Sequence, residues 1–385
     1  MSETKTFKIV FAGGGTGGHI YPGIAVADEV KTIFKEKNVP VKIYWIGSDR
    51  GMDKNLVEKN LTSQGGSIDE FIGIPCGKLR RYFSWENFTD LFRIAAGYFK
   101  AKKTLRKIQP DLLFSKGGFV SVPPCRAAKK LHIPFYTHEC DFTPGLATRL
   151  NSKNADGIFV TYEETKKYFT DDLKKKCTVT GNPVRPVFYD NSSKEGKLFL
   201  NIDSKNKKPI LLVLGGSLGA RQINNMVIEN LEWLKENFVV VHQTGKAFAD
   251  ENAPIMNSYD ADYKPYAFIY NEMPSVIHAS DVILSRAGAN SIWESSVAGK
   301  PMVLVPLCGA GTRGDQVDNA RYFEKNQAAY VLAGEDANKE NLREALTELL
   351  DKKKRKEFSK NSAALSEGVR PARKIAEILF EVVKE

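Results

Sequence analysis

The sequence is poor in cysteine and has no long hydrophobic run. Its 385 residues include five cysteines, which are dispersed and form no Cys-x-x-Cys pair. Such an odd, scattered set argues against a disulfide framework and for reduced thiols inside the cell. No window of about 18 apolar residues occurs, and the N-terminal segment lacks the apolar core of a secretory signal peptide. We therefore expect a soluble intracellular protein, or one that rests on a membrane surface.

The composition is that of a large globular protein with an excess of positive charge. Hydrophobic residues make up 42% of the chain and charged residues 26%, and the formal net charge is +10 at pH 7. The length is sufficient for two domains, each with its own core. The positive charge favours an anionic partner, which could be a nucleic acid, a phosphorylated metabolite or a membrane surface.

Two segments of the chain begin alike. Residues 7–12 (FKIVFA) are typical of a buried parallel strand, and the glycine-rich GGGTGGH of residues 13–19 leads from them into an amphipathic helix. The same order returns in residues 209–231, where a glycine turn again follows an apolar strand. The alternation of strands and helices continues in each half. It predicts an α/β protein with two Rossmann-like, doubly wound domains that face each other across a cleft.

A polar linker that contains several prolines occupies residues 182–209 and separates the two halves. We place the domain boundary near residue 187, so that the N-terminal domain spans residues 1–187 and the C-terminal domain residues 188–370. The final segment, residues 371–385, carries an apolar stripe of helical period. This helix packs either on its own domain or back on the first domain, and the sequence leaves both placements open.

The glycine turn at residues 13–19 predicts an anion-binding site. Between a strand and a helix, bare backbone N–H groups and the helix dipole face a ligand. Gly13, Gly15 and Gly18 match the dinucleotide pattern G-x-G-x-x-G, but the acidic residue expected about 20 positions later is missing. His19 follows the turn directly. Ligands bind at the ends of parallel strands in such folds, so this imidazole is placed to accept a proton from a hydroxyl group.

A second group of polar residues in the C-terminal half is typical of a nucleotide-sugar site. A turn at Gly288 opens a helix that contains Glu294, whose carboxylate can accept hydrogen bonds from both hydroxyls of a ribose. Asp315 and Gln316 offer partners for sugar hydroxyls, and Ser217 at a helix N-terminus suits a phosphate. The Asp-x-Asp triplet of residues 260–262 could suggest a metal–diphosphate site. It lies away from both glycine turns, so we attribute it to chance and expect no metal.

Several segments together resemble the MurG family of bacterial UDP-N-acetylglucosamine-dependent transferases, which have the GT-B fold. They follow one another along nearly the whole chain: FAGGGTGGHIYPGIAVA, GKLRRYFSWENF, FSKGGFVSVP, HECDFTPG, TGNPVRP, LGGSLGARQINN, SRAGANSIWE and RGDQVDNA. The resemblance implies an acceptor-binding N-terminal domain and a UDP-sugar-binding C-terminal domain. It implies inverting transfer of N-acetylglucosamine to the 4-hydroxyl of the muramyl sugar of undecaprenyl-pyrophosphoryl-MurNAc-pentapeptide. This step converts lipid I into lipid II in peptidoglycan synthesis, without a metal or cofactor.

The resemblance also implies roles for individual residues. His19 is the candidate general base. Two glycine turns bind the diphosphate of the acceptor, one formed by Gly14 and Gly15 and the other by Gly117 and Gly118. The residues implied to bind the donor are Thr16, Gly17, Gly18, Asp141, Arg185, Ser217, Ile269, Tyr270, Ala289, Asn290, Ser291, Ile292, Trp293, Glu294 and Gln316. Asp141 departs from the family pattern, in which many members have an asparagine that touches the donor sugar. The departure replaces an amide by a carboxylate at this contact.

Residues 78–107 combine positive charge with aromatic side chains. They contain nine lysines and arginines against two acidic residues. Each basic residue near an anionic lipid surface contributes about 1 kcal/mol. The predicted membrane patch consists of Arg80, Arg81, Tyr82, Phe83, Trp85 and Phe92 and indicates peripheral attachment to the anionic inner leaflet, on the cytoplasmic side of the membrane. The segment contains no recognisable nucleic-acid-binding module, so we expect no nucleic-acid partner.

Other functions remain as alternatives to the transferase. Another UDP-sugar enzyme of the same fold, such as a glycolipid synthase or a UDP-sugar 2-epimerase, is the nearest. A non-catalytic nucleotide- or membrane-binding protein would bind UDP without releasing it from the sugar nucleotide. A nicotinamide-dependent dehydrogenase is the most distant alternative, because the acidic residue of such sites is missing.

Overall fold

The computed structural model describes residues 5–77, 85–203, 205–216, 219–309, 312–368 and 370–384, and of residues 85–88 it describes the helical backbone alone. The chain divides into two compact units. Unit 1 consists of Met1–Arg185 together with Val369–Glu385, and unit 2 consists of Pro186–Gly368. The division after Arg185 lies two residues before the boundary that the linker suggests.

Unit 1 is built on a seven-stranded parallel sheet of order β3-β2-β1-β4-β5-β6-β7. The order reverses between β1 and β4, and in doubly wound sheets this is the point where the carboxyl ends of the strands bind ligands. The strands are β1 (Phe7–Gly13), β2 (Val41–Ser48), β3 (Glu70–Ile74), β4 (Leu112–Gly117), β5 (Phe135–Glu139), β6 (Gly157–Val160) and β7 (Cys177–Val179).

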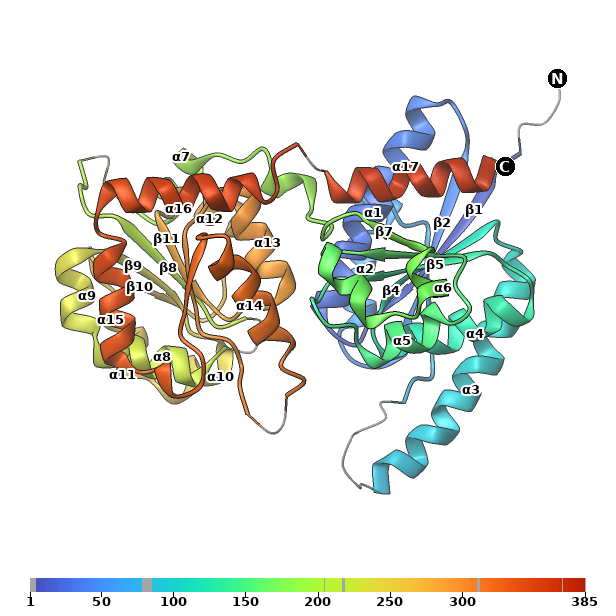
Figure 1. Cartoon of the computed structure of the whole chain (residues 1–385), viewed down its shortest axis with the longest axis horizontal. Helices are drawn as coiled ribbons and strands as arrows, with labels where there is room; N and C mark the ends of the chain where they lie inside the picture. Colours follow the sequence, from blue (N-terminus) through green and yellow to red (C-terminus); the bar gives the residue numbers. More distant parts are fainter. Residues whose placement is uncertain are drawn as a thin grey trace. The chain divides into compact units, whose positions relative to one another are not determined.

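Helices cover both faces of this sheet (Figure 1). One face packs against α1 and α17, and the other against α3 and α4. The helices are α1 (Gly17–Glu36), α2 (Asp53–Glu58), α3 (Trp85–Ile108), α4 (Val122–Lys130), α5 (Leu146–Ser152), α6 (Asp171–Lys174) and α17 (Pro371–Lys384), with short 3-10 turns at η1 (Thr62–Gln64), η2 (Phe119–Ser121) and η3 (Glu163–Tyr168).

Helix α17 returns from the end of unit 2 and packs along α1 (Figure 1). Leu379 is fully buried in the core that α1 shares, and the rings of Phe34 and Phe380 meet edge to face at 4.9 Å. The Arg373 guanidinium pairs with Glu36 at 2.7 Å. The apolar stripe visible in the sequence is therefore buried on the first half of the chain.

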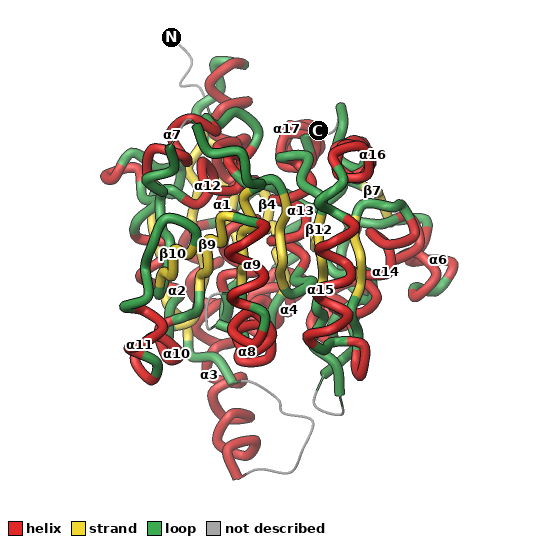
Figure 2. The backbone as a smooth tube through the Cα atoms, turned by 90° about the vertical axis from the view of Figure 1, so that its left-hand side faces the viewer, coloured by secondary structure: helices red, strands yellow, loops and turns green. Residues whose placement is uncertain are grey.

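Unit 2 contains a six-stranded parallel sheet of order β10-β9-β8-β11-β12-β13, which reverses between β8 and β11. Strands β9 and β10 lie side by side in Figure 2. The strands are β8 (Ile210–Leu214), β9 (Val239–Gln243), β10 (Tyr263–Tyr266), β11 (Val282–Ser285), β12 (Met302–Leu304) and β13 (Ala329–Val331). The predicted α/β class with a parallel sheet in each half is confirmed.

The helices of unit 2 flank its sheet in the same way. They are α7 (Ser193–Phe199), α8 (Arg221–Glu229), α9 (Leu231–Asn237), α10 (Lys246–Glu251), α11 (Ala253–Met256), α12 (Met273–Ala279), α13 (Ala289–Val297), α14 (Asp315–Lys325), α15 (Lys339–Glu348) and α16 (Lys352–Ala364), with 3-10 turns η4 (Pro186–Phe188) and η5 (Gly334–Asp336). Helix α13 begins directly after β11, at the reversal of sheet order. Its first turn therefore lies where sheets of this topology bind ligands.

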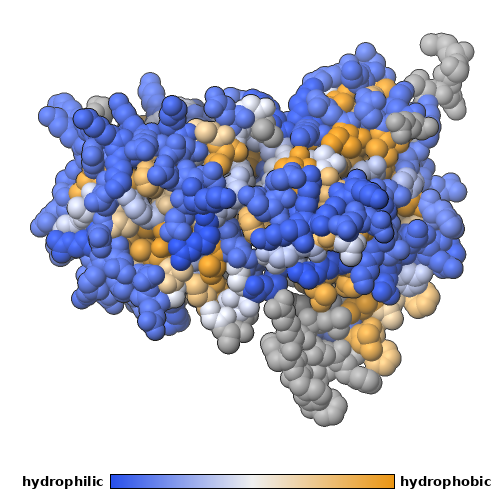
Figure 3. All heavy atoms as spheres, viewed as in Figure 1, coloured by the Kyte–Doolittle hydropathy of each residue, from blue (hydrophilic) through white to orange (hydrophobic). Residues whose placement is uncertain are grey.

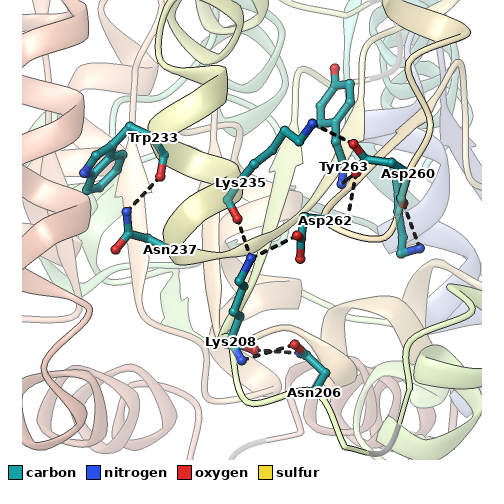
Figure 4. Close-up of polar contacts among 9 residues, drawn as sticks. Asn206, Lys208, Trp233, Lys235, Asn237, Asp260, Asp262 and Tyr263 are labelled. Atoms are coloured by element: carbon teal, nitrogen blue, oxygen red, sulfur yellow. Dashed lines mark hydrogen bonds and ion pairs between the residues drawn. The ribbon is translucent and has the colours of Figure 1, made fainter.

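The Asp-x-Asp triplet of residues 260–262 lies in the turn that precedes β10 (Figure 4). Asp260 pairs with Lys235 at 2.6 Å, and Asp262 pairs with Lys208 at 2.9 Å. Asp260 also accepts hydrogen bonds from the N–H groups of Asp262 and Tyr263. Both carboxylates thus stabilise a turn at the amino end of the sheet, opposite to the edge where doubly wound sheets bind ligands.

Helix α3 buries only one of its faces. Ala101 and Leu105 are fully buried, whereas Phe92 is 64% exposed and Phe99 is 67% exposed. Figure 3 shows apolar surface in this part of the chain. Of the predicted membrane patch, Arg80, Arg81, Tyr82, Phe83 and the side chain of Trp85 lie outside the described residues, and Phe92 is exposed as expected of a surface contact. In the described part of the chain, no helix has the length and hydrophobicity needed to cross a bilayer.

We predict that Leu379→Ala lowers the free energy of unfolding of unit 1 by about 2–5 kcal/mol, because it leaves a cavity between α17 and α1. A urea titration followed by tryptophan fluorescence measures the change. Glu381→Ala, on the exposed side of the same helix, is the matched control and should stay within about 0.5 kcal/mol. Equal curves for both variants would mean that α17 contributes nothing to the stability of unit 1.

Candidate active site

Two glycine turns meet at the carboxyl ends of β1 and β4. Gly117 and Gly118 have φ angles of 89° and 74°, in the left-handed region that favours glycine. A Cβ added to Gly118 would lie 2.6 Å from the carbonyl oxygen of Gly14 and 2.8 Å from Cδ2 of His19. The structure therefore brings Gly14, Gly118 and His19 into direct contact, as three parts of one site in unit 1.

His19 occupies the first turn of α1, where its N–H donates to the carbonyl of Thr16 at 3.1 Å. Thr16 is the extended N-cap of this 20-residue helix. The ring of His19 lies against the turn after β4, because a Cβ on Gly117 would lie 3.7 Å from its Nδ1. The predicted general base thus sits at a helix N-terminus, where an anionic ligand is favoured.

Asp53 shapes the first glycine turn, and no sequence motif pointed to it. Its carboxylate accepts the N–H of Gly15 and the N–H of Ser48, each at 2.8 Å. The side chain is 1% exposed, so burial raises the pKa of Asp53, while both amide donors oppose that rise. A Cβ on Gly14 would overlap this carboxylate. The N–H of Gly15 was expected to face a ligand, but it donates a hydrogen bond to a carboxylate of the protein itself.

The segment after β5 is shaped by Glu139. Its carboxylate accepts the N–H of Asp141 at 3.0 Å and the N–H of Gly145 at 2.9 Å. Asp141 is half-buried at the carboxyl end of the sheet, and the neighbouring His138 is buried and donates from Nε2 to the carbonyl of Gly181 at 3.0 Å. Burial lowers the pKa of His138 well below its usual value, and the charge of Lys116 lowers it further, so this imidazole stays neutral.

Arg185, the last residue of the first part of unit 1, lies over the ring of Tyr21. Its guanidinium carbon is 4.9 Å from the ring centroid, within the range of a cation–π interaction. Tyr21 belongs to the second turn of α1, so the structure places Arg185 beside the helix that carries His19.

Unit 2 has a cavity of about 350 Å³ at the reversal of its sheet order. Gly215 and Gly216 line it after β8, and Ser291 and Gln316 line it from α13 and α14. Gln316 is held in place, because its Oε1 accepts the N–H of Leu307 at 2.9 Å. The predicted donor residues Ser291 and Gln316 thus share one pocket. Ser217, which was also predicted, lies outside the described residues.

Arg286 also lines this cavity, although it was not among the predicted ligands. Its guanidinium donates to the carbonyl of Val305 at 3.0 Å and to Gln222 at 2.9 Å. Partial burial lowers the pKa of Arg286, which reflects the cost of removing its charge from water. A positive group held at a pocket in this way favours an anionic ligand.

The residues of helix α13 that were predicted to bind the nucleoside lie on two sides of the helix. Ala289, Ile292 and Trp293 are buried, and the ring of Trp293 packs on Phe323 at 5.4 Å. Asn290, Ser291 and Glu294 are partly exposed on the other side of the helix, which is the side that reaches the cavity. The buried side chains therefore support the helix, and of the partly exposed ones Ser291 lines the cavity.

The predicted uracil contacts lie after β10. The N–H of Ile269 already donates to Oε1 of Gln243 at 2.9 Å, and the Ile269 side chain is buried. Tyr270, in contrast, is 70% exposed. Of the two backbone positions that the sequence suggested, the N–H of Ile269 has a protein partner.

Parallel sheets with glycine turns at the reversal of strand order define an α/β protein of the nucleotide-binding class. The model of the glycosyltransferase family 28 N-terminal domain matches residues 9–160, and that of the C-terminal domain matches residues 210–377. A UDP-N-acetylglucosamine–N-acetylmuramyl-(pentapeptide) pyrophosphoryl-undecaprenol N-acetylglucosamine transferase of Treponema denticola is 48% identical, over 96% of each chain. The chain belongs to this transferase family, within glycosyltransferase family 28.

Solved structures share the fold at lower identity. MurG of Acinetobacter baumannii has a TM-score of 0.70 at 22% identity, covering 97% of this chain and 99% of that one. A UDP-GlcNAc 2-epimerase of Neisseria meningitidis, bound to UDP-GlcNAc, has a TM-score of 0.66 at 17% identity, covering 99% and 100%. The fold is therefore common to transferases and epimerases and does not separate the two activities.

Asp53→Asn should disturb the first glycine turn. An asparagine has one carbonyl oxygen for the two N–H donors of Gly15 and Ser48, so one donor loses its partner at a cost of about 1–3 kcal/mol. We expect a fall of that size in the free energy of unfolding and a fall in kcat/KM for the lipid acceptor.

The matched control is Asp156→Asn. Asp156 accepts the N–H of Phe135 at the amino end of β5, on the opposite edge of the same sheet. One carbonyl oxygen satisfies this single donor, so the control should keep both stability and transfer rate. If both variants lost activity equally, the special role assigned to Asp53 would be wrong.

Proposed function

We propose that this protein transfers N-acetylglucosamine from UDP-N-acetylglucosamine to the 4-hydroxyl of the muramyl sugar of undecaprenyl-pyrophosphoryl-MurNAc-pentapeptide, with inversion at the anomeric carbon. The observation that carries the proposal is the 48% identity, over nearly the whole chain, to a transferase with this activity in its name. The position of His19 between two glycine turns supports it, because the candidate base lies there next to a helix N-terminus and two turns that suit an anion.

In this mechanism the acceptor hydroxyl lies next to His19. The hydroxyl oxygen forms a bond to the anomeric carbon while the bond from that carbon to the phosphate oxygen of UDP breaks, and the hydroxyl proton passes to His19. The transition state has oxocarbenium character, as in other glycosyl chemistry. A general base contributes about 10²- to 10⁴-fold to such a step. The diphosphate of the acceptor lies at the α1 N-terminus and the turn Gly117–Gly118.

The donor occupies the cavity of unit 2. Glu294 receives the ribose hydroxyls, Gln316 the hydroxyls of N-acetylglucosamine, and the turn Gly215–Gly216 the diphosphate. Arg286 adds a positive charge at the same cavity, which stabilises the departing UDP. Of the residues in unit 1, the proposal assigns Arg185 to the diphosphate of the donor and Asp141 to its sugar.

His19→Ala tests the transferase and its base together. UDP release from UDP-N-acetylglucosamine is measured with and without a short-chain lipid I analogue. We expect release that requires the acceptor, and a fall in kcat of at least about 10²-fold in the variant. Leu198→Ala, at a side chain that is 78% exposed in unit 2, is the control and should retain the wild-type rate.

The other results separate the alternatives. Acceptor-dependent release that survives in His19→Ala keeps the transferase but removes His19 as its base. Conversion of UDP-N-acetylglucosamine to its 2-epimer without acceptor favours an epimerase. Binding of UDP without any release favours a non-catalytic nucleotide-binding protein.

We further propose that α3 attaches the protein peripherally to the cytoplasmic face of the membrane. Phe92 and Phe99 are seven residues apart and so lie on one face of the helix, and Lys103 and Arg106 continue that face. All four side chains are exposed. Apolar rings next to basic side chains suit an anionic lipid surface, into which the rings insert while the charges meet the head groups.

Replacing both rings, in Phe92→Ser/Phe99→Ser, should weaken binding to phosphatidylglycerol vesicles by at least about tenfold, because it removes the apolar surface that inserts. Co-sedimentation measures the partition, and soluble short-chain acceptor measures the unaffected chemistry. Vesicles of phosphatidylcholine should bind the wild type more weakly. If the double variant bound anionic vesicles as well as the wild type, α3 would not be the attachment site.

A further inference from the structure

Lys116 lies at a β-bulge next to the glycine turns. In the pairing of β1 with β4, Ala12 stands opposite Ser115 and Gly13 stands opposite Gly117, so Lys116 is the extra residue on β4. Bulges of this kind redirect a side chain and are common beside active sites. The Cβ of Lys116 lies 3.3 Å from the place where a Cβ on Gly13 would be.

The Lys116 side chain points toward the α1 side of the sheet. Successive residues of a strand face opposite sides, and Leu112 and Phe114, on the same side as Lys116, belong to the core that α1 covers. The charge of Lys116 acts on His138, which follows the same side of β5. The ammonium therefore lies on the side of the sheet that α1 covers, near His138.

This ammonium is buried and unpaired. Lys116 is 1% exposed, and its Nζ has no hydrogen-bond partner among the residues that the structure describes. Burying an ammonium without an acceptor is strongly unfavourable. A second buried lysine, Lys264, is 2% exposed, but its Nζ donates to the Tyr259 hydroxyl and the Asp260 carbonyl, each at 3.3 Å. Lys116 has no comparable protein partner in the described chain.

Within the described part of the chain, neither the N-terminus of α1 nor His138 supplies a negative charge to Lys116. The N-terminus of α1, on the same side of the sheet, carries a partial positive charge and so does not compensate a cation there. His138 is neutral, and its Nδ1 is itself buried without a hydrogen-bond partner among the described residues. The turn Gly117–Gly118 contributes no side chain that would separate Lys116 from a ligand, and the ring of His19 lies against this turn.

We propose that Lys116 is the buried counter-charge for a phosphate group that binds at the N-terminus of α1 and the glycine turns after β1 and β4. This inference rests on the proposed function, in which the diphosphate of the lipid acceptor occupies these turns. The interaction is effective because a charge buried in the protein interior acts across a medium of low polarisability. Lys116 then contributes to the affinity for the acceptor and leaves the affinity for the UDP-sugar unchanged.

Lys116→Met tests this role, because methionine has a similar length and no charge. Without ligand, the variant should have an unchanged or higher melting temperature, since it removes an unpaired buried charge. Its KM for the lipid I analogue should rise at least about tenfold, the loss expected when one buried charge–charge interaction is removed, with the KM for UDP-N-acetylglucosamine unchanged. Lys264→Met is the control: it should lower the melting temperature and leave both KM values unchanged.

A second measurement does not depend on transfer activity. With UDP present in excess to occupy the cavity of unit 2, inorganic pyrophosphate should raise the melting temperature of the wild type and not that of Lys116→Met. If this difference is seen but no acceptor supports transfer, the anion site stands and the proposed function fails. If pyrophosphate stabilises both proteins equally, or the acceptor KM is unchanged in the variant, the role of Lys116 is overturned. A lower melting temperature of Lys116→Met without ligand, with both KM values unchanged, would show a structural lysine instead.

Discussion

The site in unit 1 depends on the close approach of two backbone turns at the one place where the order of its sheet reverses. The turn after β1 and the turn after β4 come so near that the carbonyl of Gly14 and the ring of His19 occupy the space where Gly118 would have a side chain. Any Cβ at Gly118 would separate the turns and displace the histidine. The absence of side chains is thus what places a titratable group, a helix N-terminus and two stretches of bare backbone within one small volume.

Buried charged side chains stabilise these turns and determine the sign of the charge around them. Asp53 binds the first turn from within the protein, and Glu139 shapes the segment after β5 in the same way. Each of these carboxylates is satisfied by backbone N–H donors, so each has a structural use. Lys116 is different, because its Nζ has no hydrogen-bond partner among the described residues, and the N-terminus of α1 also favours an anion. The buried charges therefore support a diphosphate ligand more strongly than the glycine-rich turns do by themselves.

Unit 2 repeats the topology of unit 1 but uses it differently. Its cavity lies between the glycine turn after β8 and the first turns of α13 and α14, and it contains Arg286 rather than a histidine. One face of α13 packs into the core through Ile292 and Trp293, which fixes the helix, while Ser291 on the other face reaches the cavity. A rigid helix whose exposed side carries short polar groups suits recognition of a sugar nucleotide, because little conformational freedom is lost on binding.

The sequence alone determined the features that depend on local order along the chain. Alternating apolar runs and helical periods predicted a parallel sheet in each half, and the glycine turns with His19 predicted the position of a candidate site, because such turns follow strands directly. Only the tertiary structure decided which distant groups meet these turns. The use of the Gly15 N–H by Asp53 and of the Ile269 N–H by Gln243 joins residues that no spacing rule connects. The return of α17 to α1 and the burial of Lys116 have the same origin, since burial and pairing arise from packing between segments far apart in the chain.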